Sequence, residues 1–155
     1  MTKNLDKIGF NSIVDSYQLF YIDLWGVVHN GVNLHDEAIN VLRQISKKNK
    51  DYVLLTNAPR PSSSVKNFLK KMGMEEEMRD HVFTSGEAAL NYLKKNFINK
   101  TFFHVGPPRD FDLFKDFEKK KISDIKECEY ILCTGLFDDH NKDLVFYKNL
   151  FEKHL

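Results

Sequence analysis

Short apolar runs alternate along this chain with segments whose apolar residues recur at helical spacing. Five runs have the length and composition of β-strands, and they cover residues 19–24, 51–56, 81–83, 101–105 and 130–133. The second run is apolar without alternation, which is typical of a strand buried on both faces of a parallel sheet. Since strands and helices follow each other in turn, the pattern predicts an α/β fold with a doubly wound, Rossmann-like, mostly parallel sheet.

The helices between these strands are predicted from spacing and from end signals. One apolar stripe consists of four residues at i, i+3, i+4 and i+7: Ala38, Val41, Leu42 and Ile45. Thr84 and Glu87 have the spacing of a capping box at a helix start. Further helices are expected over residues 5–17, over a segment whose buried face contains Phe111, Phe114 and Phe117, and over residues 142–155 with Leu144, Tyr147, Phe151 and Leu155 inward.

Composition limits the classes of protein that this sequence can represent. The 155 residues are 42% hydrophobic and 29% charged, which fits a single globular domain over residues 1–155. A formal charge of +1 gives no reason to expect nucleic acid or an anionic membrane as partner. The N-terminus lacks the apolar stretch of a secretory signal, so we expect a cytoplasmic protein. Cys128 and Cys133 lack metal-type spacing and are expected to be reduced thiols.

Four of the predicted strands end in small or polar residues, which a parallel sheet would gather at one edge. These residues are Asp23, Thr56-Asn57, Thr84-Ser85 and Thr134-Gly135. Hydroxyl groups and loop amides donate hydrogen bonds to phosphate, and a carboxylate is either a nucleophile or a ligand for magnesium. The alternative is that each Thr or Ser is only a helix cap.

Other candidates for chemistry have simpler explanations. His29 lies in the loop just after Asp23, where it either faces the same site or is a structural or solvated residue. Asp138-Asp139 has the composition of a metal pair, but a turn before a helix also favours Asp as a cap. The sequence contains no phosphate-binding P-loop, no dinucleotide fingerprint and no G-x-S-x-G elbow.

Two of these stretches together resemble the haloacid dehalogenase (HAD) superfamily. Asp23-Leu24-Trp25-Gly26-Val27-Val28 with His29-Asn30-Gly31 is similar to its first motif, and Leu54-Leu55-Thr56-Asn57-Ala58-Pro59-Arg60 to its second. With Phe83-Thr84-Ser85-Gly86, His104-Val105-Gly106 and Leu132-Cys133-Thr134-Gly135, the series resembles subclass IIA, whose members include sugar-phosphate and nitrophenyl-phosphate phosphatases.

The resemblance implies roles for individual residues. Asp23 matches the nucleophile, which forms an aspartyl-phosphate and binds Mg²⁺ together with the backbone carbonyl of Trp25. Thr56 and the amide of Asn57 match the second-motif phosphate binders, and Thr84 and Ser85 are expected to bind phosphate beside them. The implied function is a magnesium-dependent phosphatase that acts on a small phosphorylated metabolite.

Two departures from the family pattern leave the activity of this chain open. Most phosphatases of the superfamily have a second Asp as general acid two residues after the nucleophile, where this sequence has Trp25. The third and fourth motifs and the cap would lie beyond Leu155, so the chain resembles an N-terminal fragment and residues 142–155 the start of a cap. Such a fragment is expected to self-associate or to pair with the missing half.

The departures also suggest other classes of function. The main alternative is a non-catalytic remnant of the same fold that binds phosphate or sugar phosphate. A receiver-like signalling domain is a weaker alternative. Such domains have paired acids at the end of the first strand and a phosphate-accepting Asp at the end of the third, whereas here Ile22 precedes Asp23 and the third strand ends in Thr84-Ser85.

Overall fold

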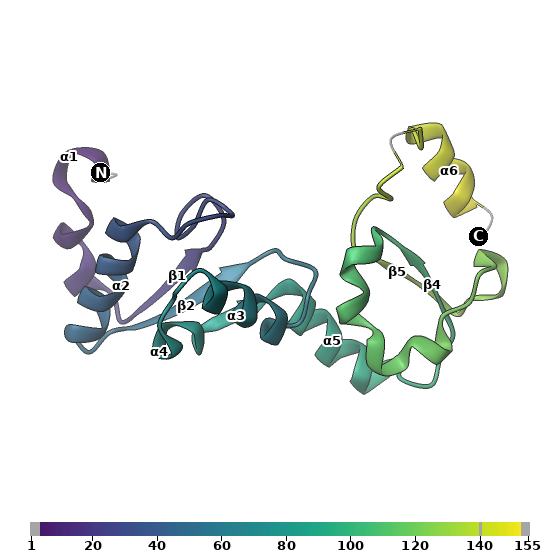
Figure 1. Ribbon diagram of the computed structural model, residues 1–155, viewed down its shortest axis with the longest axis horizontal. Coiled ribbons are helices and arrows are strands. Elements are labelled where there is room, and N and C mark those ends of the chain that lie inside the picture. Colours follow the sequence, from purple (N-terminus) through teal and green to yellow (C-terminus); the bar gives the residue numbers. More distant parts are fainter. Residues whose placement is uncertain (1–3, 140, 153–155) are drawn as a thin grey trace. The chain divides into compact units, whose positions relative to one another are not determined.

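The computed structural model of the protein describes residues 4–139 and 141–152. These residues form two compact units, each of which consists of two separate segments of the chain. The first unit extends to Thr56 and includes Val65–Phe83, and the second consists of Asn57–Ser64 and the chain from Thr84 onward. Each unit combines helices with strands (Figure 1).

The first unit contains a sheet with strand order β1-β2-β3. β1 (Leu19–Asp23) and β2 (Asp51–Thr56) are parallel, as predicted, and they pair from Leu19↔Asp51 to Asp23↔Leu55. β3 spans Val82–Thr84. β2 is buried at alternate residues only, because Tyr52, Leu54 and Thr56 are buried while Leu55 is exposed. The predicted burial of this strand on both faces is therefore wrong.

Of the helices of the first unit, α2 lies where the apolar stripe predicts one, and the helix predicted over residues 5–17 needs correction. The unit contains α1 (Leu5–Ile8), α2 (Asp36–Lys47), α4 (Glu76–Arg79) and most of α3 (Ser62–Lys71). α2 buries Ile39, Leu42 and Ile45, so its buried stripe includes Ile39, which the predicted stripe omitted. The helix predicted over 5–17 is broken. Gly9 has a left-handed φ of 72° after α1, and short 3-10 turns follow at Phe10–Ser12 and Val14–Ser16.

The second unit contains a two-stranded parallel sheet and an aromatic core. β4 (Phe102–Val105) pairs with β5 (Tyr130–Cys133), and the helices are α5 (Ser85–Asn96) and α6 (Leu144–Glu152). Short 3-10 helices lie between the strands at Pro108–Leu113, Lys115–Lys120 and Ile125–Glu127. The core cluster consists of Leu90, Leu93, Phe102, Leu113, Phe114, Phe117 and Leu132.

Two helical predictions in this unit need correction. The helix expected to contain Phe111, Phe114 and Phe117 is two 3-10 helices that meet at Phe114. A spacing of three residues suits the 3-10 helix, which has three residues per turn. In α6, Tyr147 is buried as expected, but Leu144 is exposed because it begins the helix. Leu155 lies outside the described residues.

The predicted alternation and parallel pairing are confirmed, but the described strands belong to two sheets rather than one. Asp23, Thr56 and Thr84 end strands of the three-stranded sheet, whereas Thr134 follows β5 in the other. The four predicted strand ends therefore do not share one sheet edge.

Candidate active site

Asp23 and Thr56 lie at the same end of two paired strands. Asp23 is the last residue of β1 and pairs with Leu55, and Thr56 follows as the last residue of β2. Because the strands are parallel, the carboxylate and the hydroxyl-bearing residue are delivered to the same sheet edge. The Asp23 side chain is oriented locally, since its Oδ1 accepts a hydrogen bond from Leu24 N at 2.8 Å. Asp23 is exposed, so its carboxylate is accessible to a ligand.

The loop after Asp23 is closed by its own backbone. The amides of Val28 and His29 donate to Leu24 O at 2.8 and 3.1 Å, and Gly26 N donates to His29 O at 2.8 Å. Gly26 adopts a left-handed φ of 77°, which glycine allows without a steric cost. The carbonyls of Leu24 and His29 make these bonds, and that of Trp25 is not part of them.

His29 is a structural part of this loop. It is buried, and its Nδ1 accepts a hydrogen bond from Gly31 N at 3.0 Å, so a neutral ring has its hydrogen on Nε2. Burial lowers the pKa of His29, nearby His35 lowers it further, and Asp23 opposes the shift. Its burial and its bond to Gly31 N agree with a structural rather than a solvated His29.

The residues of the first unit offer a partial set of magnesium ligands. Mg²⁺ prefers oxygen ligands and usually keeps several waters, with one or two carboxylates and substrate phosphates completing its shell. The Asp23 carboxylate and the Trp25 carbonyl are oxygen donors of this kind. Within residues 4–139 and 141–152, no cluster of three or more His, Cys, Asp or Glu could hold a metal. The donors fit an ion whose remaining ligands are waters and phosphate oxygens.

Thr84 and Ser85 lie in the second unit, and their hydroxyls contact the chain that follows β2. Thr84 is 0% exposed, caps α5 by accepting from Glu87 N at 2.9 Å, and donates to Arg60 O at 2.5 Å. Ser85 Oγ donates to Ala58 O at 3.0 Å. Both side chains therefore bind backbone carbonyls of the segment that begins with Asn57.

Sequence reasoning missed one ion pair in this region. Arg60 Nε donates to Asp110 Oδ1 at 3.4 Å, although the two residues are fifty positions apart. The only signal in the sequence is the position of Arg60 beside two prolines, which excludes regular structure there. Nothing in the spacing of residues identifies Asp110 as its partner.

The other candidates have structural roles. Asp138 pairs with Arg109, and Asp139 Oδ1 accepts from Asn141 N at 3.0 Å within the turn. α6 is instead capped by Asp143, whose Oδ1 accepts from Phe146 N at 2.8 Å. A turn interpretation thus fits Asp139, and neither Asp138 nor Asp139 caps the helix. Cys128 is buried and its thiol donates to Ile125 O at 3.2 Å, whereas Cys133 is exposed.

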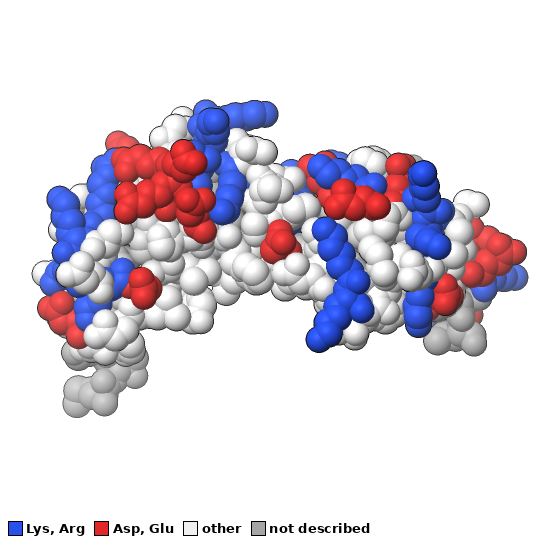
Figure 2. All heavy atoms as spheres, turned by 90° about the horizontal axis from the view of Figure 1, so that it is seen from below, with Lys and Arg blue, Asp and Glu red and all other residues white. Residues whose placement is uncertain are grey.

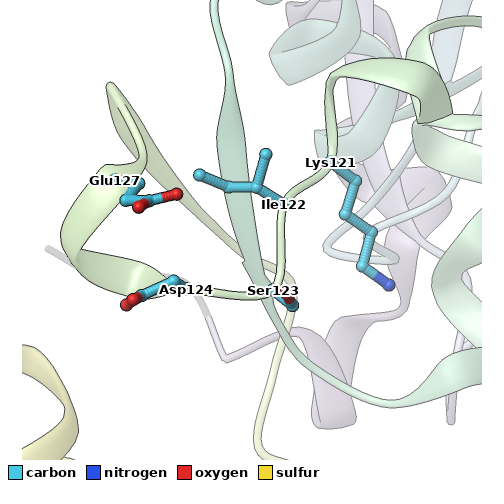
Figure 3. Close-up of a pocket in the computed structure, with 5 residues that line it drawn as sticks. All are labelled: Lys121, Ile122, Ser123, Asp124 and Glu127. Carbon is cyan, nitrogen blue, oxygen red and sulfur yellow. The ribbon is translucent and has the colours of Figure 1, made fainter.

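The second unit contains a cavity of about 450 Å³. Its lining consists of Lys121, Ile122, Ser123, Asp124 and Glu127 (Figure 3). Asp124 caps a 3-10 helix by accepting from Lys126 N at 3.0 Å. The lining contains none of the predicted site residues. On the face drawn in Figure 2, acidic and basic side chains occur beside each other.

Among the described residues, no helix is long and apolar enough to cross a membrane.

Comparison with known proteins places these features in a family. Residues 20–120 match a family model described as haloacid dehalogenase-like hydrolase. A curated relative, Phosphoglycolate phosphatase 2 of Arabidopsis thaliana, is 31% identical over 93 residues, which cover 59% of this chain and 31% of the relative. The resemblance to the HAD superfamily, subclass IIA, is confirmed.

Solved structures agree with the family match. A haloacid dehalogenase-like hydrolase from Brucella suis is 28% identical with a TM-score of 0.77, and the match covers 93% of this chain and 52% of that one. The 4-nitrophenylphosphatase of Thermotoga maritima is 26% identical with a TM-score of 0.58, covering 78% of this chain and 46% of that one. The chain thus spans about half the length of these structures.

Proposed function

Because this chain belongs to the haloacid dehalogenase-like hydrolase family, we propose that it is part of a phosphatase that hydrolyses a small phosphate ester through Asp23. The observation that carries the proposal is the parallel pairing of β1 and β2, which delivers Asp23 and Thr56 to the same sheet edge. Relatives named as phosphatases support the reaction class. The substrate would be a phosphorylated metabolite.

Each residue has a defined task in the proposed reaction. A carboxylate oxygen of Asp23 attacks phosphorus, the ester P–O bond breaks, and the alcohol leaves while Asp23 becomes an aspartyl-phosphate. Water then attacks this phosphorus, which releases inorganic phosphate and restores the carboxylate. Thr56 and the Asn57 amide would donate hydrogen bonds to the phosphoryl oxygens, whose negative charge they stabilise.

Magnesium is the proposed cofactor. Asp23 and the Trp25 carbonyl would hold it, and when bound it would neutralise charge on the phosphoryl oxygens. Trp25 itself has no group that can transfer a proton, so the leaving alkoxide would take its proton from water. This arrangement favours esters whose leaving group is already a weak base.

The experiment for this proposal compares the chain with its Asp23→Asn variant. Phosphate release is measured with a panel of phosphate esters in the presence of Mg²⁺. We expect the variant to lose turnover because an amide is a poor nucleophile, while Asp15→Asn, a change of an exposed acid in the same unit, has no such effect. Full activity of Asp23→Asn would show that another residue accepts the phosphoryl group.

A second candidate function is phosphate or sugar-phosphate binding without turnover. The observations that favour it are Trp25 at the position of the general acid and the absence of a three-acid cluster among the described residues. It predicts a rise of the thermal unfolding midpoint with inorganic phosphate, without any product from the ester panel.

A further inference from the structure

The segment that follows Thr56 is held in place by the start of α5. Residues 57–61, here called the 57–61 loop, contain Pro59 and Pro61 and lie outside helices and strands. The amide of Gly86 donates to Ala58 O at 3.1 Å, and Ser85 Oγ donates to the same carbonyl at 3.0 Å. Two donors from consecutive residues thus fix one carbonyl of the loop.

Thr84 fixes the far end of the loop. Its buried hydroxyl donates to Arg60 O and accepts from Glu87 N, so it has one donated and one accepted hydrogen bond within the protein. The capping box predicted from Thr84 and Glu87 is only half formed. The Glu87 carboxylate accepts from Ser62 N at 2.9 Å, immediately after the loop. The Glu87 side chain therefore holds Ser62, the residue that follows the loop, against the start of α5.

Close packing leaves the loop little freedom. A Cβ at Gly86 would overlap backbone atoms of Arg60, so the helix start and the loop backbone touch directly. All of these residues belong to the second unit.

Asp110 holds the same loop through a side chain. Its side chain is 4% exposed and accepts from Arg60 Nε, whose own side chain is 40% exposed. A buried carboxylate is costly without a charged or hydrogen-bonding partner, and Arg60 is such a partner. The pair therefore ties the Arg60 side chain to a buried point of the unit.

From these contacts we propose that Asp110 is a positioning residue, which acts through Arg60 to fix the 57–61 loop and with it the amide of Asn57. The inference rests on the proposed function, because Asn57 and the preceding Thr56 are the proposed phosphate binders. Thr84 acts in the same way through its bond to Arg60 O. Small displacements of groups that orient a substrate reduce the rate strongly, even when the mutated residue lies away from the chemistry.

The test is the variant Asp110→Ala with Asp116→Ala as its matched control. Asp116 also makes a 3.4 Å ion pair, with Lys94, but it does not contact the loop. With 4-nitrophenyl phosphate and Mg²⁺, we expect Asp110→Ala to lower kcat/KM about tenfold to a hundredfold, mainly through kcat. The control should stay within about twofold of the wild type. Equal kinetics of the two variants would overturn the proposal.

Amide hydrogen exchange gives a second readout that does not need activity. The Gly86 amide donates to Ala58 O, so a loosened loop should make this amide exchange faster, by on the order of tenfold, in Asp110→Ala and not in Asp116→Ala. Unchanged exchange would overturn the proposal. A wild-type chain without turnover would contradict the proposed function alone, and exchange would still decide whether Asp110 fixes the loop.

A further pair of variants applies if Asp110→Ala does not fold, as judged by circular dichroism. Thr84→Val has nearly the same shape as Thr84 but lacks the hydroxyl, whereas Thr84→Ser keeps it. We expect faster exchange at Gly86 and a lower kcat in Thr84→Val than in Thr84→Ser. Indistinguishable behaviour of the two variants would contradict the proposal.

Discussion

Trp25 is the residue that most limits the proposed chemistry. Its side chain is 68% exposed in the loop after Asp23, where most phosphatases of the superfamily have an Asp that donates a proton to the leaving group. An indole cannot replace that proton donor. The consequence is a stronger dependence of the rate on how readily the leaving group departs without protonation.

The substitution Trp25→Asp tests this consequence. We expect it to raise the hydrolysis of alkyl phosphates by up to about 10²–10⁴-fold relative to that of 4-nitrophenyl phosphate, because only the poorer leaving group needs an acid. Trp25→Phe is the control, since it removes the indole without adding an acid. Steady-state kinetics with both esters measure the ratio, and an equal ratio in all three proteins would contradict the role assigned to this position.

Two buried histidines predict how stability depends on pH. Burial lowers the pKa of His29 and of His104, and Lys121 lowers that of His104 further while Asp110 opposes the shift. Each ring is therefore neutral in the folded chain at pH values where the unfolded chain, with its ordinary pKa of 6.5, already binds a proton. Stability is then complete above about pH 6.5 and falls as the pH drops below it.

Thermal unfolding followed at about pH 7.5 and about pH 5.5 checks this expectation. The midpoint should be lower at the acid pH, and the difference between the two midpoints should shrink in His104→Gln. His104 Nε2 lies 2.9 Å from Thr134 Oγ1, and the glutamine amide keeps a polar partner for that hydroxyl. The result that would count against the account is a pH dependence of the variant equal to that of the wild type.

At the scale of elements, α5 follows β3 in the chain, and its first residues donate hydrogen bonds to the 57–61 loop. Gly86 is required at its start because a Cβ there would meet the backbone of Arg60, which cannot rotate away as a side chain can. Gly135, after β5, is the contrasting case, since a Cβ there would lie 3.6 Å from Pro107 Cδ, an ordinary contact.

The matched pair Gly86→Ala and Gly135→Ala measures this difference. We expect Gly86→Ala to destabilise the chain by about 1–3 kcal/mol through overpacking. Gly135→Ala should change the free energy of unfolding by less than about 0.5 kcal/mol. Denaturant unfolding of both variants provides the comparison, and a Gly86→Ala variant as stable as wild type would show that the loop yields.

The sequence was informative where local patterns decide the structure. The helix over Asp36–Lys47, the parallel pairing of the first two strands and the cap at Thr84 all follow from spacing or end signals. The two-face burial of β2 was predicted wrongly. A run of apolar residues does not reveal which neighbours cover each face, and Leu55 is exposed in this structure.

At the site, the sequence did not predict the contacts between residues that lie far apart along the chain. The sequence led us to propose Asp23 and Thr56 as site residues because polar residues at the ends of apolar runs mark strand ends. The ion pair of Arg60 with Asp110 and the bond from Ser62 N to Glu87 depend on contacts between distant segments. Such contacts are set by the packing of the second unit, which the hydrophobic pattern alone does not determine.

At the scale of the whole molecule, the chain forms two units and passes from one to the other after Thr56, Ser64 and Phe83. The first unit contains Asp23 and Thr56, and the second begins with Asn57. The proposed phosphate binders Thr56 and Asn57 are consecutive residues, of which Thr56 belongs to the first unit and Asn57 to the second. The exposed apolar residues Leu19, Tyr21 and Leu55 lie on the sheet face that Asp23 shares, because paired residues of β1 and β2 point the same way.

The central claim is that Asp23 accepts the phosphoryl group. The most direct measurement treats the chain with 4-nitrophenyl phosphate and Mg²⁺, reduces any acyl phosphate with borohydride and locates the modified residue by mass spectrometry. The account predicts reduction of the carboxyl at residue 23 and no modification there in Asp23→Asn. Release of nitrophenol with Asp23 unmodified would contradict the claim.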